Sequence, residues 1–313
     1  MSTMQALRAT HPLDRSAELT AKNPLYSSCL QDYLVSAVLR DLGLPPDHAP
    51  DFSRDVTTSS LFPGGLATGS ILAKEAGVLA GMEEAAFLCA HFGIRWRPQR
   101  DDGAQLAEGD AAAELSGSLP AVLAVERRLL ELLRRMSGIA TETALVRREL
   151  EGTKTLVAAT RKCPWELLDK KAVAVGGGLT HRLSLHDAVL VKDNHLAALR
   201  GSSLRDSLAR ARGAFIELEV TSRDDALQAS RLFQELALRT PCILLLDNFS
   251  PAQVRETVGL LRSEGTLPLI EASGGITREH ARAYAQAGAD VISLGYLTHS
   301  ARSLDLSLEV QHG

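Results

Sequence analysis

The second half of the chain alternates short apolar runs with longer amphipathic segments. Runs of strand character cover residues 156–160, 188–192, 214–220, 242–248, 268–273 and 291–295. Near-continuous apolar runs of this length are typical of parallel strands buried on both faces. The segments between them, such as 222–239 and 277–289, have helical character and the spacing that β/α crossovers need. The pattern predicts an α/β fold with a parallel β/α barrel, complete or slightly open, in its C-terminal part.

The first part of the chain has a different pattern. Apolar residues at helical spacing over 30–44 are followed by a polar loop and by strand-like stretches at 70–81 and 111–119. Leucines then recur at helical spacing, with arginines between them, and predict one long helix over roughly 120–150. We expect an α+β domain over residues 1–136 and a barrel domain over 137–299. The tail, 300–313, is expected to pack with the first domain.

Composition excludes several classes of protein. With 45% hydrophobic and 23% charged residues, the chain can bury a core and is not expected to be disordered. A net charge of −4, an aromatic content of 4% and the lack of a basic stripe indicate that nucleic acid is not a partner. No apolar run is long enough for a membrane span, and the first residues lack the apolar core of a secretory signal. The predicted location is the cytoplasm, without a membrane partner.

Polar residues cluster where the predicted barrel strands end. Taken singly, each has an ordinary explanation: a solvated loop, a glycine turn or an inward charge paired with a lysine. Because the carboxyl ends of parallel strands meet at one mouth, their joint placement favours a single site. The residues in question are Arg161, Lys162, His181, Arg182, Lys192, Glu219, Asp247, Ser273, Gly274, Gly295 and His299.

The sequence Ser273-Gly274-Gly275 has a specific physical use at a strand end. Backbone N–H groups of a glycine turn can approach a phosphate closely, and the dipole of the following helix favours an anion. Gly295, after the next strand, could supply a second such turn. The alternative is an ordinary turn between strand and helix.

Several motifs together resemble one known family. The strings TRK (160–162), VGGGLTHRLSLHD (175–187), VLVKDNH (189–195), LLLDNF (244–249) and EASGGI (271–276) resemble, in the same order, those of the quinolinate phosphoribosyltransferases. DVTTSSLFP, from Asp55 onward, is similar to the N-terminal part of that family, and the resemblance covers roughly residues 30–308. It implies a pentosyltransferase of de novo NAD biosynthesis, which converts quinolinate and phosphoribosyl pyrophosphate into nicotinate mononucleotide, pyrophosphate and carbon dioxide. The implied fold is an open, incomplete parallel β/α barrel with an N-terminal α+β sandwich domain, acting as a homodimer.

The resemblance also implies residue roles. Arg127 matches an arginine that crosses the dimer interface to the substrate, and Mg²⁺ accompanies the pyrophosphate substrate. Lys162, Lys192, Glu219 and Asp247 match the catalytic groups, the two acids lying near the ribose and metal. The pyridine dicarboxylate matches Arg161, His181 and Arg182, and the phosphate-binding turns match Ser273, Gly274, Gly295 and His299.

Elementary chemistry agrees with these roles. Quinolinate has two adjacent carboxylates, and the guanidinium fork pairs bidentately with a carboxylate. A single carboxylate, as in nicotinate, would not need Arg127, Arg161 and Arg182 together. The residues therefore favour the dicarboxylate as the acceptor.

Some features depart from the family. Ala159 stands where the family usually has an aspartate, and the loop over 163–171 is slightly shorter than usual. The N-terminal stretch and the 45–55 loop are longer than usual. Two alternatives stay open: a related phosphoribosyltransferase with another aromatic acid as acceptor, and a non-catalytic ligand-binding homologue. A molybdenum-associated paralogue typically lacks the KDNH string that begins here at Lys192, and a non-catalytic homologue would be expected to have lost Lys192, Glu219 or Asp247.

Overall fold

The computed structural model describes residues 8, 10–62, 64–199, 203–266 and 268–312. The chain forms two compact units, each assembled from separate stretches. The first, called the barrel unit, comprises Met1–Arg15, Leu145–Lys162 and Gly177–Leu297. The second, called the antiparallel unit, comprises Ser16–Ala144, Cys163–Gly176 and Thr298–Gly313. The domain limits expected from the sequence remain a prediction.

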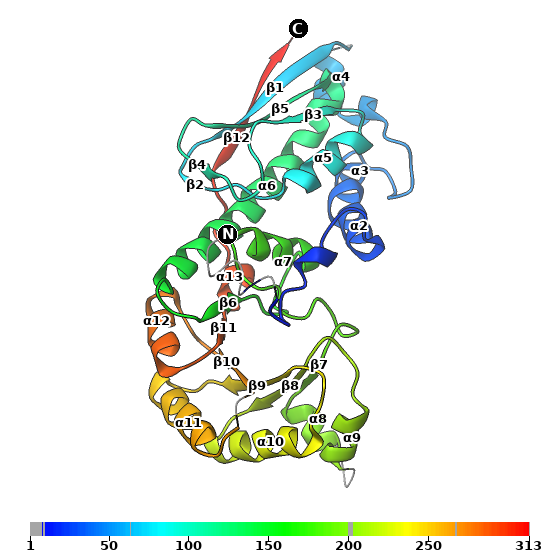
Figure 1. Cartoon of the computed structure of the whole chain (residues 1–313). Helices are drawn as coiled ribbons and strands as arrows, with labels where there is room; N and C mark the ends of the chain where they lie inside the picture. The colour runs from blue at the N-terminus through cyan, green and yellow to red at the C-terminus, as the bar shows by residue number, and fades with distance from the viewer. Residues whose placement is uncertain (1–7, 9, 63, 200–202, 267, 313) are drawn as a thin grey trace. The chain divides into compact units, whose positions relative to one another are not determined.

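A six-stranded, all-parallel sheet forms the centre of the barrel unit (Figure 1). Its strand order is β6-β11-β10-β9-β8-β7, so β6 and β7 form the two edges and the barrel is open. This confirms the predicted fold class, and each strand falls inside one of the six predicted runs. The strands are β6 (Leu156–Ala158), β7 (Val189–Val191), β8 (Ile216–Val220), β9 (Cys242–Asp247), β10 (Leu269–Ser273) and β11 (Val291–Ser293).

Helices cover the outer face of this sheet. Apolar side chains that alternate along the strands, such as Leu244 and Leu246, pack against helix residues such as Phe233 and Val258 in one buried cluster. Burial of this stripe is what holds amphipathic helices on a sheet. The covering helices are α9 (Leu204–Arg210), α10 (Arg223–Leu236), α11 (Pro251–Ser263) and α12 (Arg278–Ala287). The barrel unit also contains α8 (Asp193–Ala198), which has no buried residue, and the short α13 (Tyr296–His299) follows β11.

The side chains at the other alternate positions of each strand point to the inner face of the sheet. A second, smaller cluster of buried side chains includes Leu156, Phe215, Ile243 and Val291, which lie at or next to the amino ends of their strands. Towards the carboxyl ends the inward positions become polar, as in Glu217, Glu271 and Ser293. The period-two pattern of the strands therefore gives the barrel an apolar, packed base at the amino ends of its strands and a polar mouth at their carboxyl ends.

An antiparallel sheet of four strands, in the order β12-β1-β5-β3, forms the second unit. The C-terminal strand β12 pairs with β1 from Ala67↔His312 to Ala73↔Leu306. The strands are β1 (Leu66–Ala73), β3 (Arg95–Pro98), β5 (Ala111–Ser118) and β12 (Leu306–His312), with a separate pair β2 (Gly77–Val78) and β4 (Gln105–Leu106).

One long helix, α6 (Leu119–Glu149), confirms the helix predicted over residues 120–150. The other helical elements of the antiparallel unit are η1 (Ser16–Glu18), α2 (Pro24–Leu30), η2 (Gln31–Val35), α3 (Ser36–Asp41), η3 (Phe52–Arg54), α4 (Val56–Leu61), α5 (Met82–His91) and α7 (Glu166–Val175). None of the helices in the described residues has both the length and the apolar composition needed to cross a membrane.

Arg135 of α6 holds a buried carboxylate. Its guanidinium donates to both oxygens of Asp169, with Nε–Oδ1 and Nη2–Oδ2 distances of 2.7 and 2.8 Å, and it also donates to the carbonyl of Thr298. The guanidinium carbon lies 5.5 Å from the ring centre of Trp165. Because the Asp169 side chain is fully buried, this bidentate pair satisfies a charge that water cannot reach.

Candidate active site

Polar side chains lie at the carboxyl ends of three adjacent barrel strands. Glu219 is near the end of β8, Asp247 ends β9 and Ser273 ends β10. Ser273 lies in register with Asp247 on one side and with Ser293 of β11 on the other. The strands thus bring together residues that are far apart in the sequence, as the predicted convergence required.

Lys192 and Glu219 form an ion pair at this end of the sheet. Lys192 follows β7 directly and precedes α8, while β8 is the neighbour of β7 in the sheet. The Glu219 side chain is 13% exposed and that of Lys192 is 42% exposed. A partly buried carboxylate beside a partly exposed ammonium group can serve a substrate that carries both positive and negative charge.

The turn after β10 packs closely against the turn after β9. Gly274 has φ +101°, and a Cβ on it would lie 2.2 Å from Oδ1 and 2.8 Å from the backbone N of Asn248. The backbone N–H of Asn248, itself at φ +60°, donates to the Ser273 carbonyl at 2.8 Å, and its side-chain amide donates to Asp247 at 2.8 Å. Only glycine fits at position 274, and the close approach joins the two strand ends rigidly.

Two arginines lie near each other at the predicted dicarboxylate site. Burial lowers the pKa of Arg182, and the positive charge of Arg161 lowers it further, against the opposing effect of Glu217 and Asp187. Arg182 is 6% exposed, and Nη1 donates to the Ala188 carbonyl at 3.3 Å. Its Nε has no hydrogen-bond partner among the described residues. Two guanidinium groups that repel each other, one with an open donor, are suited to binding an anion.

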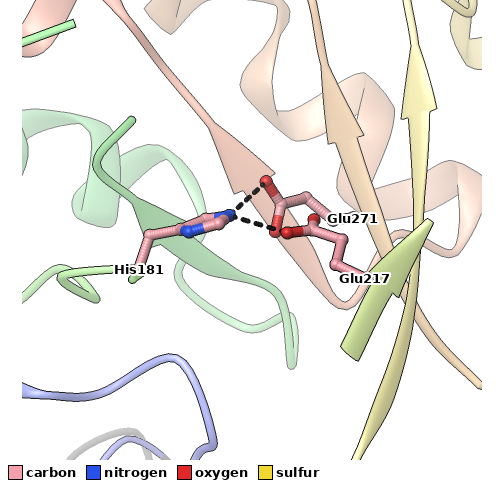
Figure 2. A group of neighbouring side chains, drawn as sticks. All are labelled: His181, Glu217 and Glu271. Carbon is pink, nitrogen blue, oxygen red and sulfur yellow. Dashed lines mark ion pairs between the residues drawn. The ribbon is translucent and has the colours of Figure 1, made fainter. Parts of the chain in front are cut away.

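His181 lies in a buried cluster with Glu217 and Glu271 (Figure 2). Its Nε2 is 3.2 Å from a Glu217 oxygen and 3.4 Å from a Glu271 oxygen, and Ser293 donates to Glu271. Burial lowers the pKa of His181, but the charges of Glu271 and Glu217 outweigh it and raise the pKa to about 9. The imidazolium lies between two carboxylates and offsets one of their two negative charges. Burial, together with the charge of Glu271, raises the pKa of Glu217 to about 7, so protonation of Glu217 removes part of the other.

Four of the predicted residues lie outside these groups of contacts: Lys162, Gly295, Arg127 and His299. Lys162 is exposed beyond β6, and Gly295 follows β11 at the carboxyl end of the barrel. Arg127 is exposed on α6, and His299 ends α13; both belong to the antiparallel unit. The roles assigned to the site residues from the resemblance stay predictions.

The sequence assigned no role to three residues of this site, Glu217, Glu271 and Asn248. Glu217 lies two positions before Glu219 in β8, and the alternation of a strand already indicated that both face inward. Asn248 follows Asp247 directly, but its positive φ and its contact with Gly274 depend on two strands meeting, so the sequence carried no local signal for them.

Comparisons with known proteins agree on one family. Residues 139–309 match the family model described as quinolinate phosphoribosyl transferase, C-terminal domain, and residues 55–137 match that of its N-terminal domain. A probable nicotinate-nucleotide pyrophosphorylase [carboxylating] from Methanothermobacter thermautotrophicus is 38% identical over 269 residues, which cover 82% of this chain and 93% of that protein.

Two further comparisons point the same way. The nicotinate-nucleotide pyrophosphorylase [carboxylating] of Mycobacterium leprae is 37% identical over 266 residues, 83% of this chain and 92% of that protein. The solved structure of the nicotinate-nucleotide pyrophosphorylase from Francisella tularensis has a TM-score of 0.74 and 29% identity, and the match covers 90% of this chain and 97% of that one.

Proposed function

The chain belongs to the quinolinate phosphoribosyltransferase family, and we propose that the charged residues at the carboxyl end of its parallel sheet carry the family's reaction. The activity is that of a carboxylating nicotinate-nucleotide pyrophosphorylase, a phosphoribosyltransferase of NAD biosynthesis. Its substrates are quinolinate and phosphoribosyl pyrophosphate. The observation that carries the assignment to this site is the buried Arg182, whose Nε has no hydrogen-bond partner among the described residues and whose charge is repelled by that of Arg161.

The arginine pair binds the acceptor. Quinolinate carries two adjacent carboxylates, and Arg161 and Arg182 present two guanidinium groups whose repulsion a dianion relieves. The predicted contact of His181 with quinolinate is supported less directly, because its Nε2 faces Glu217 and Glu271. We propose that His181 acts mainly through the backbone that it shares with Arg182.

The transfer step uses the carboxylates and lysines. The quinolinate ring nitrogen forms a bond to the anomeric carbon while the bond from that carbon to pyrophosphate breaks, with both electrons leaving on the pyrophosphate. Positive charge develops on the ribose in an oxocarbenium-like state, and Glu219 and Asp247 stabilise it and hold the ribose hydroxyl groups. Lys192, released from Glu219, and Lys162 neutralise the leaving pyrophosphate.

Decarboxylation follows at the ring. Once ribosylated, the ring nitrogen is positive and stabilises the electron pair that remains at the neighbouring carbon when carbon dioxide leaves. A proton then takes the place of the carboxylate. The protein contributes orientation and exclusion of water, for which the packed site around Arg182 is suited.

Mg²⁺ fits the carboxylates of Glu219 and Asp247. These are hard oxygen ligands on adjacent strands, partly exposed, and Mg²⁺ in proteins prefers one or two carboxylates together with substrate phosphates. When bound with the substrate, the ion would neutralise charge on the pyrophosphate. Ser273, Gly274 and Gly295 would hold the 5′-phosphate through backbone N–H groups, with His299 as a further contact.

A homodimer completes the proposal. Arg127 is exposed on α6, and no ion pair or hydrogen bond of its side chain is recorded among the described residues. It is therefore available to reach the substrate of a partner subunit, as the family resemblance implies. We further propose a cytoplasmic location, where reduced thiols and NAD biosynthesis are expected together.

Kinetics of Arg182→Gln test the assignment of the dicarboxylate site. Loss of a charge-assisted bidentate contact should raise the KM for quinolinate by about tenfold to a hundredfold, while the KM for phosphoribosyl pyrophosphate stays near the wild-type value. Arg212→Gln is the matched control, because within the described part of the chain that exposed guanidinium donates only to the nearby carbonyls of Ala209 and Ala211. An equal rise in both KM values would contradict the assignment.

A further inference from the structure

An N-terminal segment, residues 10–15, lies outside both stretches that match the family models. In the structure it belongs to the barrel unit rather than to the unit that follows it in sequence. Leu13 is fully buried in the inner cluster with Phe215, Ile243 and Val291. Since these residues lie at or next to the amino ends of their strands, the segment fills the base of the open barrel, opposite the polar mouth.

The same segment is bonded to one end of the loop that carries His181 and Arg182. The backbone N–H of Arg15 donates to Thr180 Oγ1 at 2.8 Å, and that hydroxyl donates to the Leu13 carbonyl at 3.1 Å. Thr180 is fully buried. Thr180 follows Leu179, which pairs with Ala158 of β6. Its hydroxyl thus joins the N-terminal segment to a stretch that is already held at the edge of the sheet.

Asp187 fixes the other end of this loop. One of its oxygens accepts from Arg15 Nε at 3.0 Å, and the other accepts from the backbone N–H of Leu183 at 2.9 Å. The Asp187 side chain is only 6% exposed. A single aspartate therefore connects the N-terminal segment to the residue that directly follows Arg182.

The segment is ordered by bonds of its own. The Leu13 N–H donates to His11 Nδ1 at 3.2 Å, and Arg8 pairs with Asp14 at 2.9 Å. His11 also feels the charge of Glu271 from the buried cluster, which opposes the lowering of its pKa by burial. The segment is thus next to the carboxylates that hold His181.

We propose that residues 10–15 are a plug that closes the base of the open barrel and holds residues 180–187, so that Arg182 keeps the geometry in which it binds the substrate dicarboxylate. This loop connects the two edge strands, β6 and β7. Its ends are held at the sheet by the pairing of Leu179 with Ala158 and by the hydrogen bond from the Ala214 N–H to the Asp187 carbonyl, whereas residues 181–186 belong to no strand. Leu13, Arg15, Thr180 and Asp187 are positioning residues. Their effect on catalysis depends on the proposed function, whereas their effect on the loop does not.

Thr180→Val and Asp187→Asn test the plug in the full chain. Thr180→Val removes the acceptor of the Arg15 N–H. Asp187→Asn removes the negative charge and leaves one acceptor oxygen for the two donors, Arg15 and Leu183. Both variants keep the shape of the side chain. Because a displacement of about 1 Å at a substrate-binding group can cost about a hundredfold, we expect kcat/KM for quinolinate to fall by about ten- to a hundredfold. The KM for phosphoribosyl pyrophosphate should not change, and amide exchange of residues 181–187 should become faster. Thr240→Val is the control. Thr240 lies in the same unit, and among the described residues its carbonyl accepts a hydrogen bond from Cys242, whereas its side chain makes none.

The outcomes separate the two proposals. Faster exchange in 181–187 with a selective loss for quinolinate supports the plug and its role in binding. Unchanged exchange and kinetics in both variants would overturn it. If the wild-type protein does not use quinolinate, the proposed function fails, and exchange in 181–187 alone then decides whether the plug holds the loop. Leu13→Ala adds a third test, and should it fail to fold, the two isosteric variants still decide.

Discussion

Gly274 is the position at which one methyl group should damage the site most selectively. In the Gly274→Ala protein the new Cβ would lie 2.2 Å from Oδ1 and 2.8 Å from the backbone N of Asn248. The side-chain oxygen can move away only by disturbing the amide that donates to Asp247. The backbone nitrogen can move only with the turn itself, which carries the hydrogen bond to Ser273.

The magnitude follows from these contacts. The atoms must separate by about 1 Å to restore ordinary contact, and a displacement of that size at a substrate-binding turn costs about a hundredfold in rate. The left-handed backbone of residue 274 adds about 1–2 kcal/mol of strain to the folded state. We therefore expect kcat/KM for phosphoribosyl pyrophosphate to fall by about ten- to a hundredfold, with a modest loss of stability.

Gly265→Ala separates strain from displacement. Gly265 also has a positive φ, +71°, but a Cβ there would meet no heavy atom within 4 Å. It should lose about 1 kcal/mol of stability and keep its kinetics. Steady-state kinetics with each substrate varied, together with urea unfolding, measure both effects. Wild-type kinetics in the Gly274→Ala protein, or equal losses in the two variants, would refute the reasoning.

Three further predictions concern charged residues. The pKa of His181 is raised from 6.5 to about 9, so its contribution to stability is complete below pH 6.5 and is lost as the pH rises through 9. The loss amounts to about 3 kcal/mol. Denaturant unfolding measured from pH 6 to 9.5 should show this decline, and a flat profile would contradict it. Arg135→Ala leaves the buried Asp169 carboxylate without its positively charged partner and should lower the free energy of unfolding by about 3–5 kcal/mol. A loss below about 1 kcal/mol would contradict this. Mixing Arg127→Ala with Lys192→Ala subunits should restore activity in heterodimers, and no recovery after verified subunit exchange would argue against a shared site.

Periodicity alone predicted most of the barrel. The six apolar runs became the six parallel strands, because near-continuous burial on both faces leaves a pattern that local sequence can carry. The long helix α6 was equally clear from its leucine spacing. The expected association of the tail with the first domain agrees with the pairing of β12 with β1. The rest of the division was less visible, since the barrel unit takes in Met1–Arg15 and the antiparallel unit takes in Cys163–Gly176.

The site was predictable where strand ends carry unusual residues. Lys192, Glu219, Asp247 and Ser273 could be assigned to one end of the sheet from the parallel topology. The burial of His181 between two carboxylates could not be predicted, because it depends on two inward glutamates from strands that are not neighbours in the sheet.

The N-terminal segment shows the clearest limit of local sequence. Its sequence, Thr10 to Arg15, has no marked pattern, and its contacts with Thr180 and Asp187 join residues more than 160 positions apart. Such contacts arise only once the barrel has formed. The sequence of residues 10–15 therefore gives no indication that this segment lies next to the substrate-binding loop.

Product analysis with the purified protein tests the central claim most directly. The protein is supplied with phosphoribosyl pyrophosphate and Mg²⁺, and with either quinolinate or nicotinate as acceptor. The account predicts nicotinate mononucleotide, pyrophosphate and an equal amount of carbon dioxide from quinolinate, and no product from nicotinate. Turnover of nicotinate, or nucleotide formation from quinolinate without release of carbon dioxide, would contradict it.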